Sequence, residues 1–217
     1  MKKILYVFFC ILFFVISAAA VIGFRMSRVK TIVPTKPIFT PATLDFKLDP
    51  PHQSLTGKVM RIKGGATQLT RKADDPSIIK INGFVLEGEQ ITASESGTLD
   101  VRFAQEDLFS IFPDTILAFP STNPKNFLVK QDKGTVEYQT DEQVATISAR
   151  SLHALFSLSQ GKARLSVDPD EKLIDFNVIE GTGRVGYIDT NNQTQTSEIK
   201  SGEKIIYDDI KRVVRTR

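Results

Sequence analysis

The sequence is short of several residue types that carry chemistry. Among its 217 residues there is no tryptophan, one cysteine, two histidines and three methionines. The single cysteine, Cys10, excludes an intramolecular disulfide and a metal site built from several thiolates. In their place the chain has 15 phenylalanines and many β-branched residues. This composition favours pleated strands over helices.

Positive and negative charges are nearly balanced. The chain has 28 basic and 25 acidic side chains, a net charge of +3 and an isoelectric point near 8.9. The basic residues are spread along the sequence, whereas a nucleic-acid-binding domain concentrates them on one face. We therefore expect no nucleic-acid partner.

The longest apolar run lies at the N-terminus. Ile4–Phe24 follows two lysines and is ended by Arg25, and about 20 apolar residues are enough to cross a bilayer core. The small residues Ser17–Ala20 also fit a signal-peptide cleavage site, but the run continues beyond them. Residues 1–25 are therefore predicted as an uncleaved membrane anchor, with a cleaved signal peptide and a secreted domain as the alternative.

Lysines on the N-terminal side of the span indicate its orientation. Lys2 and Lys3 precede the span, and Arg25, Arg28 and Lys30 follow it and compete with them. We expect the N-terminus inside the cell and the domain on the extracytoplasmic side of the cell membrane. The inverted arrangement, with a cytoplasmic domain, is the alternative.

The remaining chain divides by composition. Half of the ten prolines lie between Thr31 and Pro51, which predicts an extended, proline-rich linker over residues 26–54. A β-rich domain is expected over residues 55–209. The basic residues of 210–217 are expected to form a solvated tail.

Period-two alternation is clearest in the middle of the domain. Apolar Leu99, Val101 and Phe103 alternate with polar residues, as in a strand with one buried face. Pro113-Asp114 then separates two further strand-like runs. Short runs of this kind recur about every 8–12 residues with glycine turns, which predicts an all-β fold, a single sandwich or solenoid-like domain of short antiparallel strands.

Glycines and polar stretches set the expected strand ends. Separate strands are predicted on the two sides of Gly134 and of Gly161, a hairpin over Val178–Val185, and a polar loop over Thr190–Thr196. Glu87–Ile91 also resembles Ser201–Ile205, each a Gly-Glu turn that opens a strand. The two copies suggest related halves.

The order of these signals resembles the FecR-like periplasmic domain family over about residues 56–208. The matching elements are an opening strand (Gly57–Ile62), a Leu-x-Gly-Glu-x-Ile-x-Thr turn (Leu86–Thr92), an alternating strand (Ser96–Phe103), a Pro-x-Thr-x-Leu step (Ile111–Leu117), a Gly-x-x-x-Val strand (Gly134–Tyr138), the Val178–Val185 segment and a closing Gly-Glu strand (Gly202–Tyr207). The resemblance implies an anchored envelope β-domain used for binding.

Two departures limit what the resemblance implies. An Arg-Gly-Thr-x-Phe segment common in the family is altered to Arg150–Phe156 here. The family members that regulate iron uptake also carry a cytoplasmic sigma-factor-binding domain, whereas three residues precede the span in this sequence. The sigma-regulator role is therefore not carried over.

Several patterns resemble parts of catalytic or metal-binding sites. His52 lies beside the linker, and His153 lies among apolar residues, where a core or interface histidine is expected rather than a catalytic one. The Asp168–Glu171 carboxylates are expected at a solvated hairpin tip rather than in a calcium loop. Glu180–Gly183 has no following helix, so a β-bulge or hairpin is expected rather than a phosphate loop. No catalytic residue, metal ligand or cofactor is predicted.

The sequence therefore predicts a membrane-anchored, extracytoplasmic binding or assembly module without enzymatic activity. Its expected partners are the membrane, through Ile4–Phe24, and an envelope protein or polysaccharide. A signal-sensing subunit that relays ligand binding through a membrane partner is the alternative function.

Overall fold

The computed structural model describes residues 53–104, 107–140 and 146–216, and in these residues every regular element is a β-strand. The all-β prediction is confirmed. The chain divides into two compact units, Met1–Asp45 and Phe46–Arg217, and all described residues belong to the second. None of the described residues forms a helix long and apolar enough to span a membrane, and the predicted anchor lies outside them.

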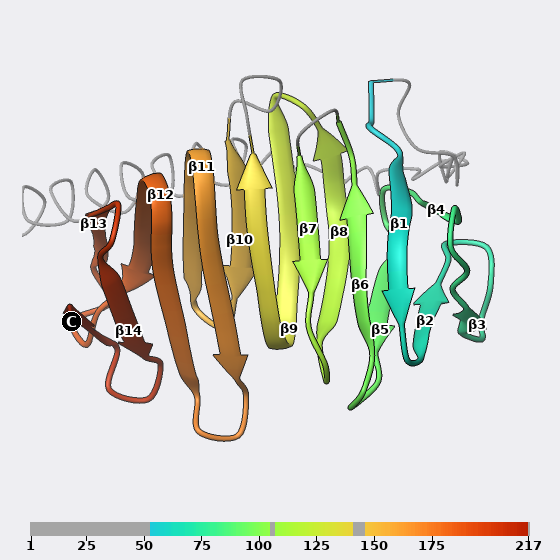
Figure 1. Cartoon of the computed structure of the whole chain (residues 1–217). Helices are drawn as coiled ribbons and strands as arrows, with labels where there is room; N and C mark the ends of the chain where they lie inside the picture. The colour runs from blue at the N-terminus through green and yellow to red at the C-terminus, as the bar shows by residue number, and fades with distance from the viewer. Residues whose placement is uncertain (1–52, 105–106, 141–145, 217) are drawn as a thin grey trace, which may run out of the picture. The chain divides into compact units, whose positions relative to one another are not determined.

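Fifteen strands build the described unit (Figure 1). In chain order they are β1 (Gly57–Lys63), β2 (Ala66–Leu69), β3 (Ser77–Ile78), β4 (Phe84–Val85), β5 (Gln90–Ala93), β6 (Thr98–Arg102), β7 (Leu108–Ile111), β8 (Ile116–Asn123), β9 (Asn126–Thr140), β10 (Ile147–Ser151), β11 (Ala154–Asp168), β12 (Leu173–Ile188), β13 (Thr194–Lys200), β14 (Lys204–Asp208) and β15 (Val213–Thr216).

Strand pairing forms one continuous sheet that folds into two layers around a shared core. Layer A has the order β4-β1-β6-β7-β9-β11-β12-β14-β15, and layer B has the order β3-β2-β5-β8-β9-β10-β11-β12-β13. All pairs are antiparallel except β9 with β10, which is parallel. The layers are joined because β9, β11 and β12 are long enough to belong to both.

Each of these long strands bends at a glycine with positive φ: Gly134 (85°), Gly161 (118°) and Gly181 (86°). In β9 the buried positions are odd-numbered from 127 to 131 and even-numbered from 136 to 140, so the buried phase changes at the bend. Gly161 pairs with Gly181, and a Cβ on Gly181 would lie 1.9 Å from the Gln160 carbonyl oxygen. Only glycine fits this approach.

These bends correct part of the predicted strand map. The runs on the two sides of Gly134 are one strand, β9, and those around Gly161 are one strand, β11. The hairpin predicted over Val178–Val185 is wrong, because the segment lies inside β12 and continues across the bend. The β-bulge alternative is the better description, since the β11–β12 register shifts beside Gly181.

The core between the layers is mostly aliphatic, and its largest aromatic cluster in the described residues is centred on Phe103. Phe103 contacts Phe109, Phe119 and Phe127 with ring centroids 5.2, 5.1 and 5.0 Å apart. Tyr138 joins the cluster through Phe109, at 5.3 Å. The phenylalanines that the composition assigned to strands therefore pack mainly against one another.

A buried amide supports the bend of β9. Gln131 is fully buried, and its Nε2 donates to the carbonyl oxygens of Gly134 (2.8 Å) and Leu165 (3.1 Å). Tyr138 donates its hydroxyl to Gln131 Oε1 at 2.7 Å, and burial raises the pKa of this phenol well above its usual value. Both polar atoms of the Gln131 amide thus have partners inside the core.

The two Gly-Glu turns that resemble each other in sequence have the same hydrogen bonds. In the first turn, Glu89 N donates to Leu86 O (3.2 Å) and Leu86 N donates to Glu89 Oε2 (2.7 Å). In the second, Glu203 N donates to Lys200 O (2.9 Å) and Lys200 N donates to Glu203 Oε2 (2.8 Å). The central glycines, Gly88 and Gly202, both have φ of 82°, as a type II turn requires at this position.

Candidate binding surface

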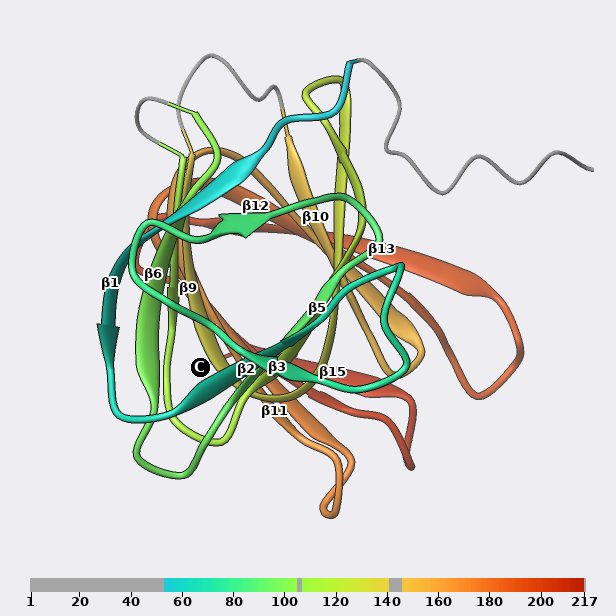
Figure 2. The ribbon, with the colours of Figure 1, turned by 90° about the vertical axis from the view of Figure 1, so that its right-hand side faces the viewer.

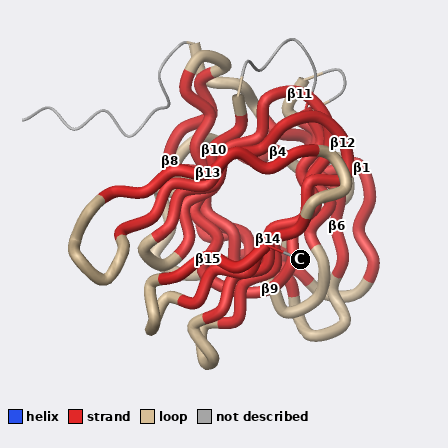
Figure 3. Tube along the Cα trace, turned by 90° about the vertical axis from the view of Figure 1, so that its left-hand side faces the viewer, coloured by secondary structure: helices blue, strands red, loops and turns tan. Residues whose placement is uncertain are grey.

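The four strands at the ends of the two layers differ in length. β3 and β4, at one end, have two residues each, and Pro76 comes directly before β3. β15 and β13 lie at the other end (Figure 3), and they have four and seven residues. Short strands and prolines are common devices that protect sheet edges from pairing. β13 has neither.

β13 pairs with β12 alone among the described strands, over its whole length from Thr194 (with Ile188) to Lys200 (with Thr182). In an antiparallel pair, alternate residues direct their backbone groups toward the partner strand, and the others direct them away. β13 therefore presents an outer row of backbone donors and acceptors to an incoming strand.

Both ends of β13 are held by turns. At its start, Asp189 Oδ1 accepts from the backbone N–H groups of Asn191 (2.8 Å) and Gln193 (2.9 Å), and Oδ2 accepts from Gln195 Nε2 (2.8 Å). These bonds, that from the Gln193 N–H above all, lower the pKa of Asp189. At its end, the Glu203 turn holds Lys200, and Ile199 is 1% exposed in the core. The edge is thus ordered without a partner.

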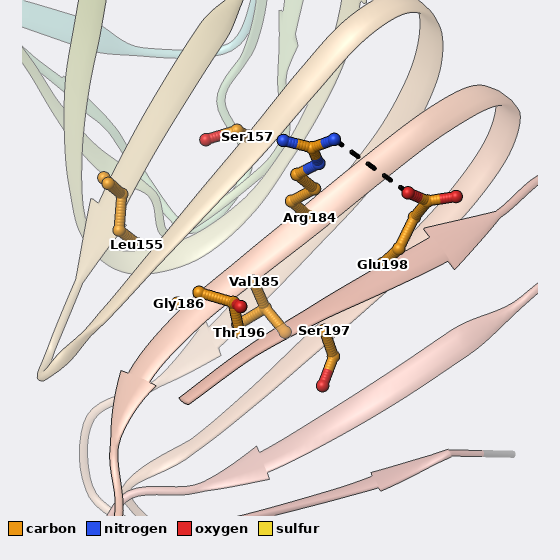
Figure 4. Close-up of a pocket in the computed structure, with 8 residues that line it drawn as sticks. All are labelled: Leu155, Ser157, Arg184, Val185, Gly186, Thr196, Ser197 and Glu198. Carbon is orange, nitrogen blue, oxygen red and sulfur yellow. Dashed lines mark ion pairs between the residues drawn. The ribbon is translucent and has the colours of Figure 1, made fainter. Parts of the chain in front are cut away.

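A shallow hollow of about 420 Å³ lies beside this edge, on the outer face of layer B (Figure 4). It exists because Gly186 has no side chain, and a Cβ added there would have no neighbour closer than 4.0 Å. The residues that line it are Leu155, Ser157, Arg184, Val185, Gly186, Thr196, Ser197 and Glu198.

The hollow combines one half-exposed apolar side chain with hydroxyl groups and one ion pair. Leu155 is 43% exposed. Arg184 lies opposite Glu198 on the neighbouring strand, and their charged atoms are 4.0 Å apart. The two side chains are 75% and 53% exposed, so the pair is well solvated and weakly coupled. Such a lining suits a side chain of a bound polypeptide better than a small metabolite, which needs a more enclosed pocket.

His153, which the sequence predicts as a core or interface histidine, does not lie in the core. Its side chain is 67% exposed, because it lies in the two-residue turn between β10 and β11. Its Nδ1 is 3.0 Å from both carboxylate oxygens of Asp209. Within the described residues the ring bonds only to Asp209, and no nucleophile is held against it, so this pair resembles a structural link more than a catalytic base. His52 lies outside the described residues.

A buried tyrosine lies near this link. Burial and the charge of Asp209 raise the pKa of Tyr207 to about 12. Its ring contacts Tyr187 with centroids 5.5 Å apart, which joins β14 of layer A to β12. Tyr207 therefore stays neutral and helps to hold the two layers together near β13.

The acidic hairpin tip forms where it was predicted. β11 ends at Asp168, and its Oδ1 accepts from the N–H groups of Asp170 (2.9 Å) and Glu171 (3.0 Å). This carboxylate closes a turn, as aspartate commonly does in tight loops. The C-terminal segment differs from its prediction, because Val213–Thr216 forms β15 and pairs with β14 instead of fraying.

The sequence did not identify β13. The sequence predicts a polar loop over Thr190–Thr196, which includes the first residues of β13, because Thr194–Lys200 contains a single large apolar residue, Ile199. The signal that could have found it is the repeated Gly-Glu turn. A strand that ends at the second turn is expected once the two turns are recognised as equivalent.

Comparison of the sequence with protein family models and with characterised proteins finds no match. Two crystal structures of a proposed anti-sigma factor from Parabacteroides distasonis, at 1.65 and 2.50 Å resolution, are similar in fold, with TM-scores of 0.50 and 0.51. In each case 14% of aligned residues are identical, and the match covers 59% of this chain and 58% of the other. The chain thus spans little more than half of these proteins' length, and at this identity it is similar to them in fold alone.

Proposed function

We propose that this protein is a membrane-anchored, extracytoplasmic binding module without catalysis, and that it recruits an envelope protein by pairing an extended segment with β13. The observation that carries the proposal is the edge itself. β13 has seven residues, is held at both ends and pairs only with β12 in the described part of the chain.

Strand addition explains why an edge and a hollow occur together. Main-chain hydrogen bonds along an edge supply affinity without regard to sequence, and neighbouring depressions select side chains. The hollow around Gly186 lies one strand inward from the edge. A side chain of the added strand can fold back over β13 toward the hollow. An envelope protein fits this geometry better than a polysaccharide, which has no backbone donors in strand spacing.

The location rests on the sequence. Ile4–Phe24 is long enough to anchor the chain, and the lysines before it favour an extracytoplasmic domain. Protease added to intact bacterial cells should cleave the domain while the anchor stays in the membrane fraction. Protection until the inner membrane is broken would contradict this location, and release of the domain into the medium would favour the cleaved alternative.

The edge is tested with the full chain expressed in a bacterial envelope and a photo-cross-linking residue at Thr194, an exposed residue at the start of β13. We expect a cross-link to an extended segment of an envelope protein, identified by mass spectrometry. The same residue at Ile210, which is 73% exposed and outside every strand, is the matched control.

Two neighbouring proline variants sharpen this test. Thr196→Pro and Ser197→Pro each remove one N–H, and the alternation of β13 directs one toward β12 and the other outward. The variant that loses the outward N–H should keep the melting temperature within a few degrees and abolish the cross-link. Equal cross-linking in both variants would contradict strand addition.

A signal-sensing subunit is the second candidate. The two structures of similar fold are described as an anti-sigma factor, which names a regulatory protein rather than an enzyme. In this case the segment paired with β13 would belong to a membrane regulator. A transcriptional response that disappears with the outward proline variant would favour it, and an unchanged transcript profile would leave the assembly role.

A further inference from the structure

Three large apolar side chains are exposed at the end of the sheet opposite β13. Ile78 is 77%, Ile81 57% and Phe84 63% exposed, and we refer to them as the end patch. Single exposed apolar residues are ordinary on protein surfaces, whereas several on one short segment indicate a surface that is covered.

The segment that carries the end patch is well fixed. It crosses from β3 in layer B to β4 in layer A (Figure 2). Ile79 N donates to Ala66 O in layer B (3.1 Å), and Val59 N in layer A donates to Gly83 O (2.9 Å). Ile79 is 5% exposed and packs in the core between its exposed neighbours. The exposure is thus a property of the ordered fold.

The described chain begins at this same end. Ser54 Oγ donates to Glu87 Oε2 at 2.6 Å, and Leu55 N donates to Thr122 O at 3.0 Å. Glu87 is only 7% exposed and also accepts from Thr122 N at 3.1 Å. Because Glu87 follows Phe84 by three residues, Ser54 lies close to the part of the end patch that Phe84 forms.

The sequence before Ser54 has a pattern that suits a contact with the end patch. Phe46-Lys47-Leu48-Asp49 alternates apolar and polar side chains, as a half-buried strand does, and Pro50-Pro51 favours an extended backbone. At about 3.3 Å per residue, Leu48 can lie up to about 20 Å from Ser54. β4 pairs with β1 alone among the described strands, but the Phe84 carbonyl oxygen accepts from Gln68 Nε2 at 2.9 Å, so the contact expected here is one of side chains.

We propose that Phe46–Pro51 lies over the end patch of its own chain, with Phe46 and Leu48 against Ile81 and Phe84. Stacked β-structures need a cap where the last layer would otherwise expose its apolar side. A segment joined to the domain at Ser54 is present at a high effective concentration, which favours it over a second molecule. The inference does not depend on β13 or on the partner that binds there.

Trypsin cleavage after Lys47 tests the contact in the full chain in detergent. Lys30, in the same proline-rich stretch, is the internal reference, and both rates are divided by those of the urea-denatured chain. We expect Lys47 to be protected relative to Lys30. Removing one buried aromatic contact should raise the cleavage rate at Lys47 about tenfold, in Phe84→Asp and equally in Phe46→Ala, which changes only the segment.

Ile210→Asp, at an exposed apolar residue remote in sequence (73% against 63% for Phe84), is the matched control and should leave the Lys47 rate unchanged. Equal cleavage at Lys47 and Lys30 in the unchanged protein would overturn the proposal. Protection that depends on protein concentration would indicate a second copy instead. Protection in lipid nanodiscs but not in detergent would indicate a lipid surface, and either result would also overturn it.

Discussion

The turn at Leu86–Glu89 and the turn at Lys200–Glu203 are local copies in different surroundings. In each, the glycine N–H donates to a buried residue of a neighbouring strand, Phe119 at 2.7 Å or Val178 at 2.8 Å. That residue's N–H returns to the glutamate carbonyl, at 2.9 or 3.0 Å. The backbone bonding is therefore the same in both halves of the domain.

The side chains around the two turns differ. Glu89 is 5% exposed and accepts a second bond from Gln68 Nε2 at 2.5 Å, whereas the carboxylate bond of Glu203 lies at the surface. Gly88 lies under Arg71, and Gly202 has open space above it. The two turns have the same geometry, but we expect the loss of their hydrogen bonds to cost different amounts of stability. The reason is that a polar group costs more to leave unpaired when it is buried.

Replacing the glutamate of each turn should give the largest difference in stability between the two turns. Glu89→Ala leaves the part-buried N–H of Leu86 without its acceptor, removes one of the two acceptors of Gln68 Nε2 and empties a buried site, so we expect a loss of about 2–3 kcal/mol in the free energy of unfolding. Glu203→Ala frees a group that water can reach, and a loss of about 0.5–1 kcal/mol is expected. Urea denaturation of both variants measures the difference. Equal losses would show that the turn alone sets the energy.

Alanine at the two glycines should give a smaller contrast. Both positions have φ of 82°, which costs an alanine about 1 kcal/mol. At Gly88 the new Cβ would also lie 1.8 Å from Arg71 Nε, so Arg71 must move away from Glu87, 3.7 Å from its guanidinium. We expect about 2 kcal/mol for Gly88→Ala and about 1 kcal/mol for Gly202→Ala, measured by thermal denaturation. In an Arg71→Ala background, Gly88→Ala should cost about as much as Gly202→Ala, because the clash with Arg71 is gone. A cost that stays at about 2 kcal/mol in that background would contradict the steric explanation.

The smallest expected effect is that of acid, which should lower the stability of the C-terminal part of the domain before that of the N-terminal part. Hydrogen bonds lower the pKa of Asp189, and for Asp208 the backbone N–H and then the side chain of Lys211 do the same. A pKa that is lower in the folded state adds stability above the unfolded value, 3.8 for aspartate, and this contribution is lost as the pH falls through the folded value.

Hydrogen exchange of the β13 and β15 amides, corrected for intrinsic rates, should therefore lose protection below about pH 4 while β5 keeps it. Asp189→Asn should make β13 protection independent of pH in this range. Simultaneous loss in β5 and β13 would show that the two halves unfold together in acid.

Local patterns were enough to predict most turns and the all-β class. Leu99 and Val101 in β6, and Phe103 directly after it, alternate with polar residues because they face the core, and Pro113-Asp114 ends β7 whatever its surroundings. The repeated Gly-Glu turn was visible because its hydrogen bonds join residues three apart. The candidate site was not predicted, because β13 is a strand through pairing with β12 rather than through its own apolar pattern.

What the sequence determined by itself is therefore the short-range part of this protein: strand composition, turn chemistry and the apolar N-terminal run. The tertiary structure decided whether a glycine ends a strand or bends it. Gly134, Gly161 and Gly181 look like strand ends in sequence, yet each lies inside a strand that continues into the other layer. The physical reason is that positive φ permits both outcomes, and only the hydrogen bonds to distant strands select one.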